Sequence, residues 1–183
     1  MKEDETGLKL KVSDAEDLHV VAGLMQDALV EPRAMRFWND DQRFVGLFYR
    51  FCWEDCAPDT APDDKTSAYV NADANSDTDT DTDCAYSRRH TTIIFDQVKA
   101  VQVRGIDFDS AVPLELLDIQ FCDQSDKPEE QGQHIKLIFA DDKALRLHIN
   151  RLVAAMEDVG ARAPTRFRPC HDNNDTAGTQ SLS

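Results

Sequence analysis

The residues of this chain best suited to chemistry are its cysteines and histidines. Ligands for a zinc ion are present on paper as Cys52, Cys56 and Cys84 with one of Cys122, Cys170 or His171. Structural zinc sites usually carry two closely spaced pairs of ligands, and this chain has one loose pair, Cys52 and Cys56. The competing interpretation is a Cys52 buried in a strand and two incidental loop thiols. We therefore predict no metal ligand and no cofactor.

Cys170 and His171 are adjacent, but a cysteine nucleophile needs a base that is held in a fixed geometry. These two residues lie in a polar tail beside Pro169, which offers no rigid frame. His134 and His148 fall near opposite ends of two predicted strands, so we expect them not to form a ligand pair. A glycine-rich phosphate loop, a nucleophile elbow and an H-E-x-x-H helix are all missing from the sequence. No catalytic residue is therefore predicted.

Two further patterns have both a chemical and a structural interpretation. The Asp-Thr repeat at 76–83 could recruit calcium, but it lacks the spaced ligands, central glycine and final glutamate of an EF-hand loop. A solubilising loop is the favoured interpretation. Arg104 before Gly105 could hold a guanidinium at a sheet rim, where it would anchor a carboxylate or a partner. Pairing with Asp107 or Asp109 beside it is favoured instead.

The net charge of −15 is concentrated in one segment. Residues 54–87 hold ten acidic residues and one lysine, a net charge of −9. This Asp-, Thr-, Ala- and Pro-rich composition cannot bury enough apolar surface to offset its ordering entropy, so we predict a disordered acidic insert at 55–87. The sign of the charge disfavours binding to nucleic acid and to anionic membranes. Arg162, Arg166 and Arg168 form one short basic cluster, which we interpret as part of a solvated tail.

The N-terminus and the cysteine count bear on location. Residues 1–5 include no apolar stretch typical of a secretory signal, and no apolar run reaches the roughly 18 residues of a membrane span. Five cysteines is an odd number, which suits free thiols in a reducing compartment. We therefore predict a cytoplasmic protein that does not enter a membrane.

The segment 134–160 gives the clearest structural pattern. Apolar residues alternate with period two over 134–139 and 143–149, which predicts a β-hairpin around 140–142. Leu152, Val153, Met156 and Val159 then follow helical spacing, and Gly160 suits a helix C-cap. This pattern predicts an amphipathic C-terminal helix.

Further elements come from the same reasoning. A capping box of Ser13 and Glu16 predicts a short helix that ends near Gly23. Strands are predicted at 8–12, 24–30, 33–38, 42–53, 91–95, 100–106 and 117–121. The strand at 42–53 is apolar on both sides, with Val45 to Trp53 on one face and Phe44 to Phe48 on the other, so we expect it to be central and covered.

These elements define an α+β fold. We predict a mostly antiparallel β-sheet or partly open barrel with a pleckstrin-homology-like outline, one short early helix, and a C-terminal amphipathic helix that closes one end. The prediction places a single folded domain at 8–160, interrupted by the insert at 55–87, and a mostly disordered polar tail at 161–183.

Several short pieces of the chain resemble a known family. They are Asp14-Ala15-Glu16-Asp17-Leu18, Gln26-Asp27-Ala28, Arg43-Phe44, Phe51-Cys52-Trp53-Glu54, Phe95-Asp96-Gln97-Val98, Val103-Arg104-Gly105-Ile106-Asp107 and the final hairpin with its predicted helix. Together they are similar to an uncharacterised domain-of-unknown-function family found mainly in alphaproteobacteria. The resemblance covers roughly residues 8–171 without the insert. It implies a compact bacterial cytoplasmic domain and no particular reaction.

A β-rich scaffold without a catalytic constellation favours a non-enzymatic protein-interaction module that binds a protein partner, since small sheets commonly accept peptides at an exposed edge. The alternative is a small-molecule-binding protein or an enzyme with a cavity lined by aromatic residues. The rings available for it are Phe44, Phe48, Tyr49, Phe51 and Trp53. A weaker alternative is a cysteine-dependent zinc-binding regulator.

Overall fold

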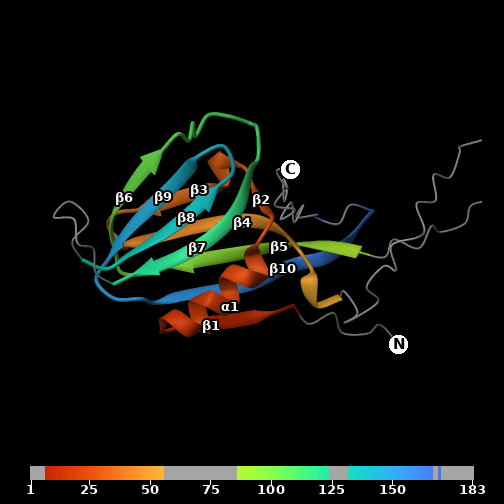
Figure 1. The fold of residues 1–183 in the computed structure, drawn as a ribbon, viewed down its shortest axis with the longest axis horizontal. Coiled ribbons are helices and arrows are strands. Elements are labelled where there is room, and N and C mark those ends of the chain that lie inside the picture. The colour runs from red at the N-terminus through yellow and green to blue at the C-terminus, as the bar shows by residue number, and fades with distance from the viewer. Residues whose placement is uncertain (1–6, 56–85, 124–131, 167–168, 170–183) are drawn as a thin grey trace, which may run out of the picture.

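The residues that the structure describes fold into one antiparallel sheet with a single α-helix against one face (Figure 1). This computed structural model describes residues 7–55, 86–123, 132–166 and 169. The strands are β1 (Lys9–Val12), β2 (Ala28–Val30), β3 (Met35–Trp38), β4 (Arg43–Phe51), β5 (Tyr86–Phe95), β6 (Val98–Arg104), β7 (Leu114–Cys122), β8 (His134–Phe139), β9 (Lys143–Ile149) and β10 (Ala154–Thr165). The helices are α1 (Ala15–Met25) and the 3-10 turns η1 (Pro32–Ala34) and η2 (Trp53–Asp55).

The strands lie in the order β1-β10-β5-β4-β2-β7-β8-β9-β6, and β3 pairs with β4. Every strand pair in the described ranges is antiparallel, which confirms the predicted sheet type. The terminal strands β1 and β6 are not neighbours, so the sheet stays open and does not close into a barrel.

Helix α1 covers the inner face of the sheet and supplies much of the core. Its buried side chains Leu18, Val21 and Met25 belong to one apolar cluster with the strand residues Phe44 and Phe95. The helix begins one residue later than predicted, because Asp14 rather than Ser13 is the N-cap and accepts a hydrogen bond from the Asp17 backbone N–H at 2.9 Å. No helix of the described residues is long and apolar enough to cross a membrane.

The predicted C-terminal helix is wrong, because residues 154–165 form strand β10. Ala154 and Met156 are buried in alternation, and β10 pairs with both β1 and β5, so tertiary pairing overrides the local helical spacing. Gly160, at φ +77°, lies in a register shift between Val159 and Ala163 instead of capping a helix. The pleckstrin-homology-like outline depended on that closing helix and is not confirmed.

Two predicted boundaries also change. Tyr86 and Ser87, placed in the insert, belong to β5, and residues 161–165, placed in the tail, belong to β10. The rest of the predicted insert, apart from Asp55, lies outside the described residues, as does the tail from residue 170 onward. The hairpin of β8 and β9 has the predicted bounds, and Asp141 and Asp142 take positive φ at its turn.

Strand β4 is central, as predicted, but its two faces differ. Phe44, Gly46, Phe48 and Arg50 point into the core and are buried, while the opposite face, with Leu47 41% exposed, is only partly covered. The strand is therefore enclosed on one side and accessible on the other.

Candidate binding notch on strand β4

A notch opens along β4 where two strands pair with it in succession on the same side. Strand β3 pairs with β4 as far as Gly46, and β2 pairs with it at Tyr49. Leu47 and Phe48 lie between these contacts, and no described strand is in register with them on that side. Pro32 has no backbone N–H and starts the η1 turn, so the chain leaves the sheet after β2 and returns as β3.

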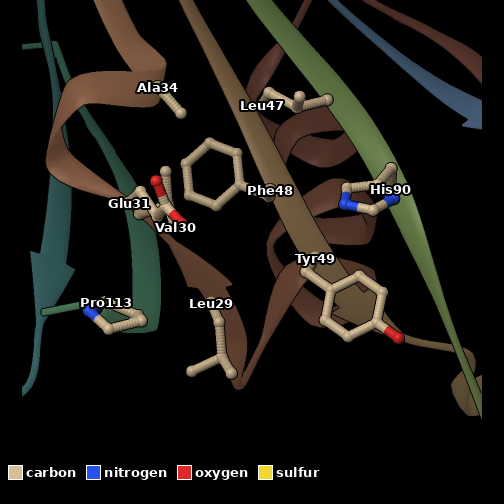
Figure 2. A pocket seen from close by; sticks show the side chains of 9 residues that line it. All are labelled: Leu29, Val30, Glu31, Ala34, Leu47, Phe48, Tyr49, His90 and Pro113. Carbon is tan, nitrogen blue, oxygen red and sulfur yellow. The ribbon is translucent and has the colours of Figure 1, made fainter. Parts of the chain in front are cut away.

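The notch is a pocket of about 390 Å³ between β2, η1, β4 and β5. It is lined by Leu29, Val30, Glu31, Ala34, Leu47, Phe48, Tyr49, His90 and Pro113. Figure 2 shows the Phe48 ring between β4 and the segment that carries Val30 and Ala34, with Tyr49 and His90 side by side on neighbouring strands. Phe48 is fully buried and forms a fixed apolar floor, whereas Leu47 is exposed at the rim.

Two of the polar residues that line the notch have described contacts with neighbours. The Glu31 carboxylate accepts a hydrogen bond from Arg33 Nε at 2.7 Å, and the His90 ring lies 5.0 Å from the Tyr49 ring at an interplanar angle of 42°. Glu31 is the only permanently charged residue among the nine that line the pocket. These residues contain no nucleophile with an oriented base, so the geometry suits binding of an apolar group better than catalysis.

A buried ionic cluster lies behind the notch, on the core side of β4. Arg50 has no exposed side-chain surface, and its guanidinium donates to both carboxylate oxygens of Asp158 at 2.9 and 2.7 Å. It also donates to both carboxylate oxygens of Glu54, at 2.9 and 2.7 Å. Two bidentate carboxylates thus compensate for the desolvation of one arginine.

Asp158 also joins the two ends of the domain. Its carboxylate accepts hydrogen bonds from the Thr91 hydroxyl at 2.7 Å and from the Leu8 backbone N–H at 2.9 Å. Burial alone would raise the pKa of Asp158, but the hydrogen bonds from Arg50, Thr91 and Leu8 outweigh it and lower the pKa below its usual range. The aspartate is therefore a fixed anion that ties β1 and β5 to β10.

The two described cysteines lie at the ends of different strands. Cys52 is buried just after β4, as predicted, and Cys122 is half-buried at the end of β7. Cys56, Cys84, Cys170 and His171 lie outside the described residues. Within the part of the chain that the structure describes, no three potential metal ligands are grouped closely enough to hold an ion.

The predicted separation of His134 and His148 is wrong. They are directly opposite each other on β8 and β9, with ring centroids 6.1 Å apart, because the first residue of one hairpin arm faces the last paired residue of the other. Burial, followed by the positive charges of His134 and Arg146, lowers the pKa of His148. The pair was recognisable from the predicted turn at 140–142, because His134 and His148 are equally distant in sequence from its central residue, Asp141.

Arg104 does pair with an acidic residue, but not with the predicted one. Its guanidinium donates to the Asp142 carboxylate at 2.6 Å and to the Asp142 carbonyl at 3.0 Å, while Asp107 accepts from the Asp109 backbone N–H. Arg162, assigned to the tail, lies half-buried in β10. In both cases the strand register, which sequence spacing does not show, decides the neighbours.

Sequence reasoning missed both the notch and the ionic cluster. One signal for the cluster was present, since Arg50 is the only charged residue in the apolar run 44–53. A signal for the notch was Pro32, placed between two predicted strands. The aromatic residues proposed from the sequence to line a cavity do not all do so. Phe48 and Tyr49 line the notch, whereas Phe44 and Phe51 are buried in the interior.

An open antiparallel sheet covered by one helix, with an apolar notch in its surface, defines the class of this domain as α+β and β-rich. Residues 8–171 match the family described as "Protein of unknown function (DUF2948)", so the chain belongs to that family. This result confirms the predicted membership of a domain-of-unknown-function family. No curated protein and no solved structure matches the chain.

Proposed function

We propose that this protein is a non-enzymatic, cytoplasmic protein-interaction module that binds a partner segment at the notch on β4. The observation that carries the proposal is the gap beside Leu47 and Phe48, where β4 has an accessible apolar face and no described strand in register with it on the side opposite β5. The gap is too short for a long added strand, so the partner's main contribution is a bulky apolar side chain that fills the pocket above Phe48.

The partner's charge follows from that of the domain. The chain has a net charge of −15, of which −6 lies outside residues 54–87, and Glu31 contributes a carboxylate at the notch rim. A basic segment is attracted to such a surface, and complementary charge raises the rate of association. The expected ligand is therefore an extended peptide with an apolar anchor residue flanked by lysine or arginine.

A random peptide library displayed on phage and selected against the full chain tests this proposal. Selection should enrich peptides that combine one bulky apolar residue with flanking basic residues. Leu47→Asp should abolish binding of the selected peptides because it places a charge at the rim of the notch. Val20→Asp is the matched control, since Val20 is 57% exposed on α1, away from the notch, and should bind as the wild type does.

Enrichment of peptides whose binding survives Leu47→Asp would contradict the proposed site. Enrichment of acidic peptides would contradict the proposed partner chemistry. If no peptide is enriched while a fragment screen yields apolar small molecules that shift the NMR signals of Leu47 and Tyr49, the small-molecule alternative is favoured, because a pocket of about 390 Å³ is within the usual size for such ligands.

A further inference from the structure

The outer face of β6, β7, β8 and β9 carries cations that the notch and the ionic cluster do not involve. The strand registers place four residues directly opposite one another in one row across the four strands, namely Gln120, Lys136, Arg146 and Gln102. Residues opposite each other on antiparallel strands have their side chains on the same face. The neighbouring residues Ile135 and Leu137 point into the core, so this row faces outward.

The next row creates a hollow in that face. It contains Asp118, Ile138, Ala144 and Arg104, again directly opposite one another. Ala144 has the smallest of these side chains, and a pocket of about 320 Å³ opens above it. The pocket is lined by Gln102, Val103, Arg104, Lys136, Ala144 and Arg146. Three permanent cations therefore surround one depression on a protein whose net charge is strongly negative.

The position of Lys136 directly opposite Arg146 destabilises the sheet, and the acidic composition of the chain does not explain why two cations face each other. Like charges directly opposite each other on two strands destabilise a sheet. The chain has 35 acidic residues against 20 lysines and arginines, so an acidic residue was readily available for either position. Both side chains are half-buried, which limits screening of their repulsion by solvent. An anion bound between them would turn this repulsion into attraction.

Two acidic residues in the described part of this face, Asp142 and Asp118, have contacts of their own. Asp142 binds the Arg104 guanidinium from the side of the β8–β9 turn, and Asp118 accepts hydrogen bonds from the Ile119 backbone N–H and the Gln120 amide, each at 2.8 Å. On the opposite side, His134 and His148 extend the same face, and the lowered pKa of His148 reflects burial and then the positive charges of His134 and Arg146.

We propose that the hollow above Ala144 binds a small dianion of the phosphate class, held by Lys136, Arg146 and Arg104. Several converging cations match a doubly charged tetrahedral group better than a single carboxylate, and a guanidinium donates to such a group through two N–H bonds. The net charge of −15 repels long polyanions, so the ligand is a small molecule rather than a nucleic acid. Both free phosphate and a phosphomonoester present this chemistry.

Titration of the full-length protein, followed by two-dimensional ¹H–¹⁵N NMR at constant ionic strength, tests the proposal. The probes are inorganic phosphate, phenyl phosphate, acetate and a single-stranded oligothymidine. Both phosphates should shift the signals of Lys136, Ala144 and Arg146 in a saturable way, and acetate should not. Tighter binding of phenyl phosphate would assign a phosphomonoester, and tighter binding of inorganic phosphate would assign the free ion.

Three variants make the result specific. Lys136→Gln should weaken phosphate binding about tenfold, the effect of one lost charge-assisted hydrogen bond. Ala144→Leu should block binding by filling the hollow without changing the charge. Lys11→Gln removes an exposed cation from β1, at the other end of the sheet, and should leave binding unchanged. Equal losses in all three variants, preferred binding of the oligothymidine, or no saturable shift with either phosphate would overturn the proposal.

Discussion

The guanidinium of Arg50 and the carboxylate of Asp158 form a bidentate ion pair, although 108 positions separate them in the sequence. Both side chains are fully buried. Because Asp158 also accepts the Leu8 backbone N–H, the pair joins the first strand, the central strand and the last strand of the sheet. Its position explains how the first and last described strands are held to the central strand of the sheet.

Replacing Asp158 with alanine should lower the free energy of unfolding by about 3–5 kcal/mol, because it leaves a buried arginine with only one of its two carboxylates. Urea denaturation followed by circular dichroism measures this change. Glu157→Gln is the control, since Glu157 pairs with Lys9 on the exposed surface and should contribute little. A double variant, Arg50→Met with Asp158→Leu, should recover much of the loss, and a double variant as unstable as Asp158→Ala would contradict this account.

The same cluster predicts a loss of stability in acid. The hydrogen bonds from Arg50 outweigh burial and keep the pKa values of Glu54 and Asp158 below their ordinary values of 4.5 and 3.8. A group with a depressed pKa in the folded state stabilises the fold above its unfolded pKa and loses that effect as the pH falls through the folded value. The free energy of unfolding should therefore decrease as the pH falls below about 4.5, and Glu54→Gln should flatten this dependence.

The lowered pKa of His148 predicts a second pH dependence of the free energy of unfolding, nearer to neutral pH. Its pKa is lowered in the folded state by burial and by the charges of His134 and Arg146, so the unfolded chain binds a proton that the folded chain rejects. Stability should therefore decrease as the pH falls through the ordinary value of 6.5. Denaturation measured at several pH values on either side of 6.5 should show that the free energy of unfolding changes less with pH in His148→Gln than in the wild type. His19→Gln, on the exposed side of α1, is the histidine variant for comparison.

Lys136→Glu should stabilise the protein in the absence of any added anion. The substitution replaces a directly opposed pair of like charges with a glutamate facing Arg146, a change of about 0.2–1 kcal/mol in favour of the fold. Thermal unfolding in a chloride buffer without phosphate measures it. A lower melting temperature for Lys136→Glu would show that Lys136 makes a stabilising contact in the free protein, against the repulsion inferred from the register.

Most strands were predictable because period-two alternation reflects burial on one face. The β8–β9 hairpin, the β3–β4 hairpin and the early helix follow directly from their sequences. The segment around Met156 was not predictable locally, since its apolar spacing fits a helix while the free edges of β1 and β5 required a strand. A period is a local property, and pairing partners are a property of the whole sheet.

The candidate sites were less predictable than the fold. Strand pairing alone brings Arg50 next to Asp158 and Lys136 next to Arg146. The spacing of these residues along the chain does not predict either contact. The notch depends on two short strands that share one side of β4, which requires knowledge of both registers. Pro32 indicates that the chain breaks between β2 and β3. That β4 is the strand exposed at this break is known only from the sheet topology.

Gly46 supplies a final prediction, because it links the core to the notch. A Cβ atom added at this position would lie 2.6 Å from a carbon of the Phe48 ring, and that ring is fully buried. In Gly46→Ala the ring must move, so the free energy of unfolding should fall by about 1–3 kcal/mol and the floor of the notch should shift.

Gly23 offers the matched control, since a Cβ atom added there meets no atom within 4 Å and the residue lies inside α1. Gly23→Ala should raise stability by about 0.5–1 kcal/mol through its better helix propensity. Urea denaturation of the two variants should therefore give changes of opposite sign, and the selected peptides should bind more weakly to Gly46→Ala alone. A stable Gly46→Ala variant with unchanged peptide binding would show that Phe48 is not the rigid floor that the notch requires.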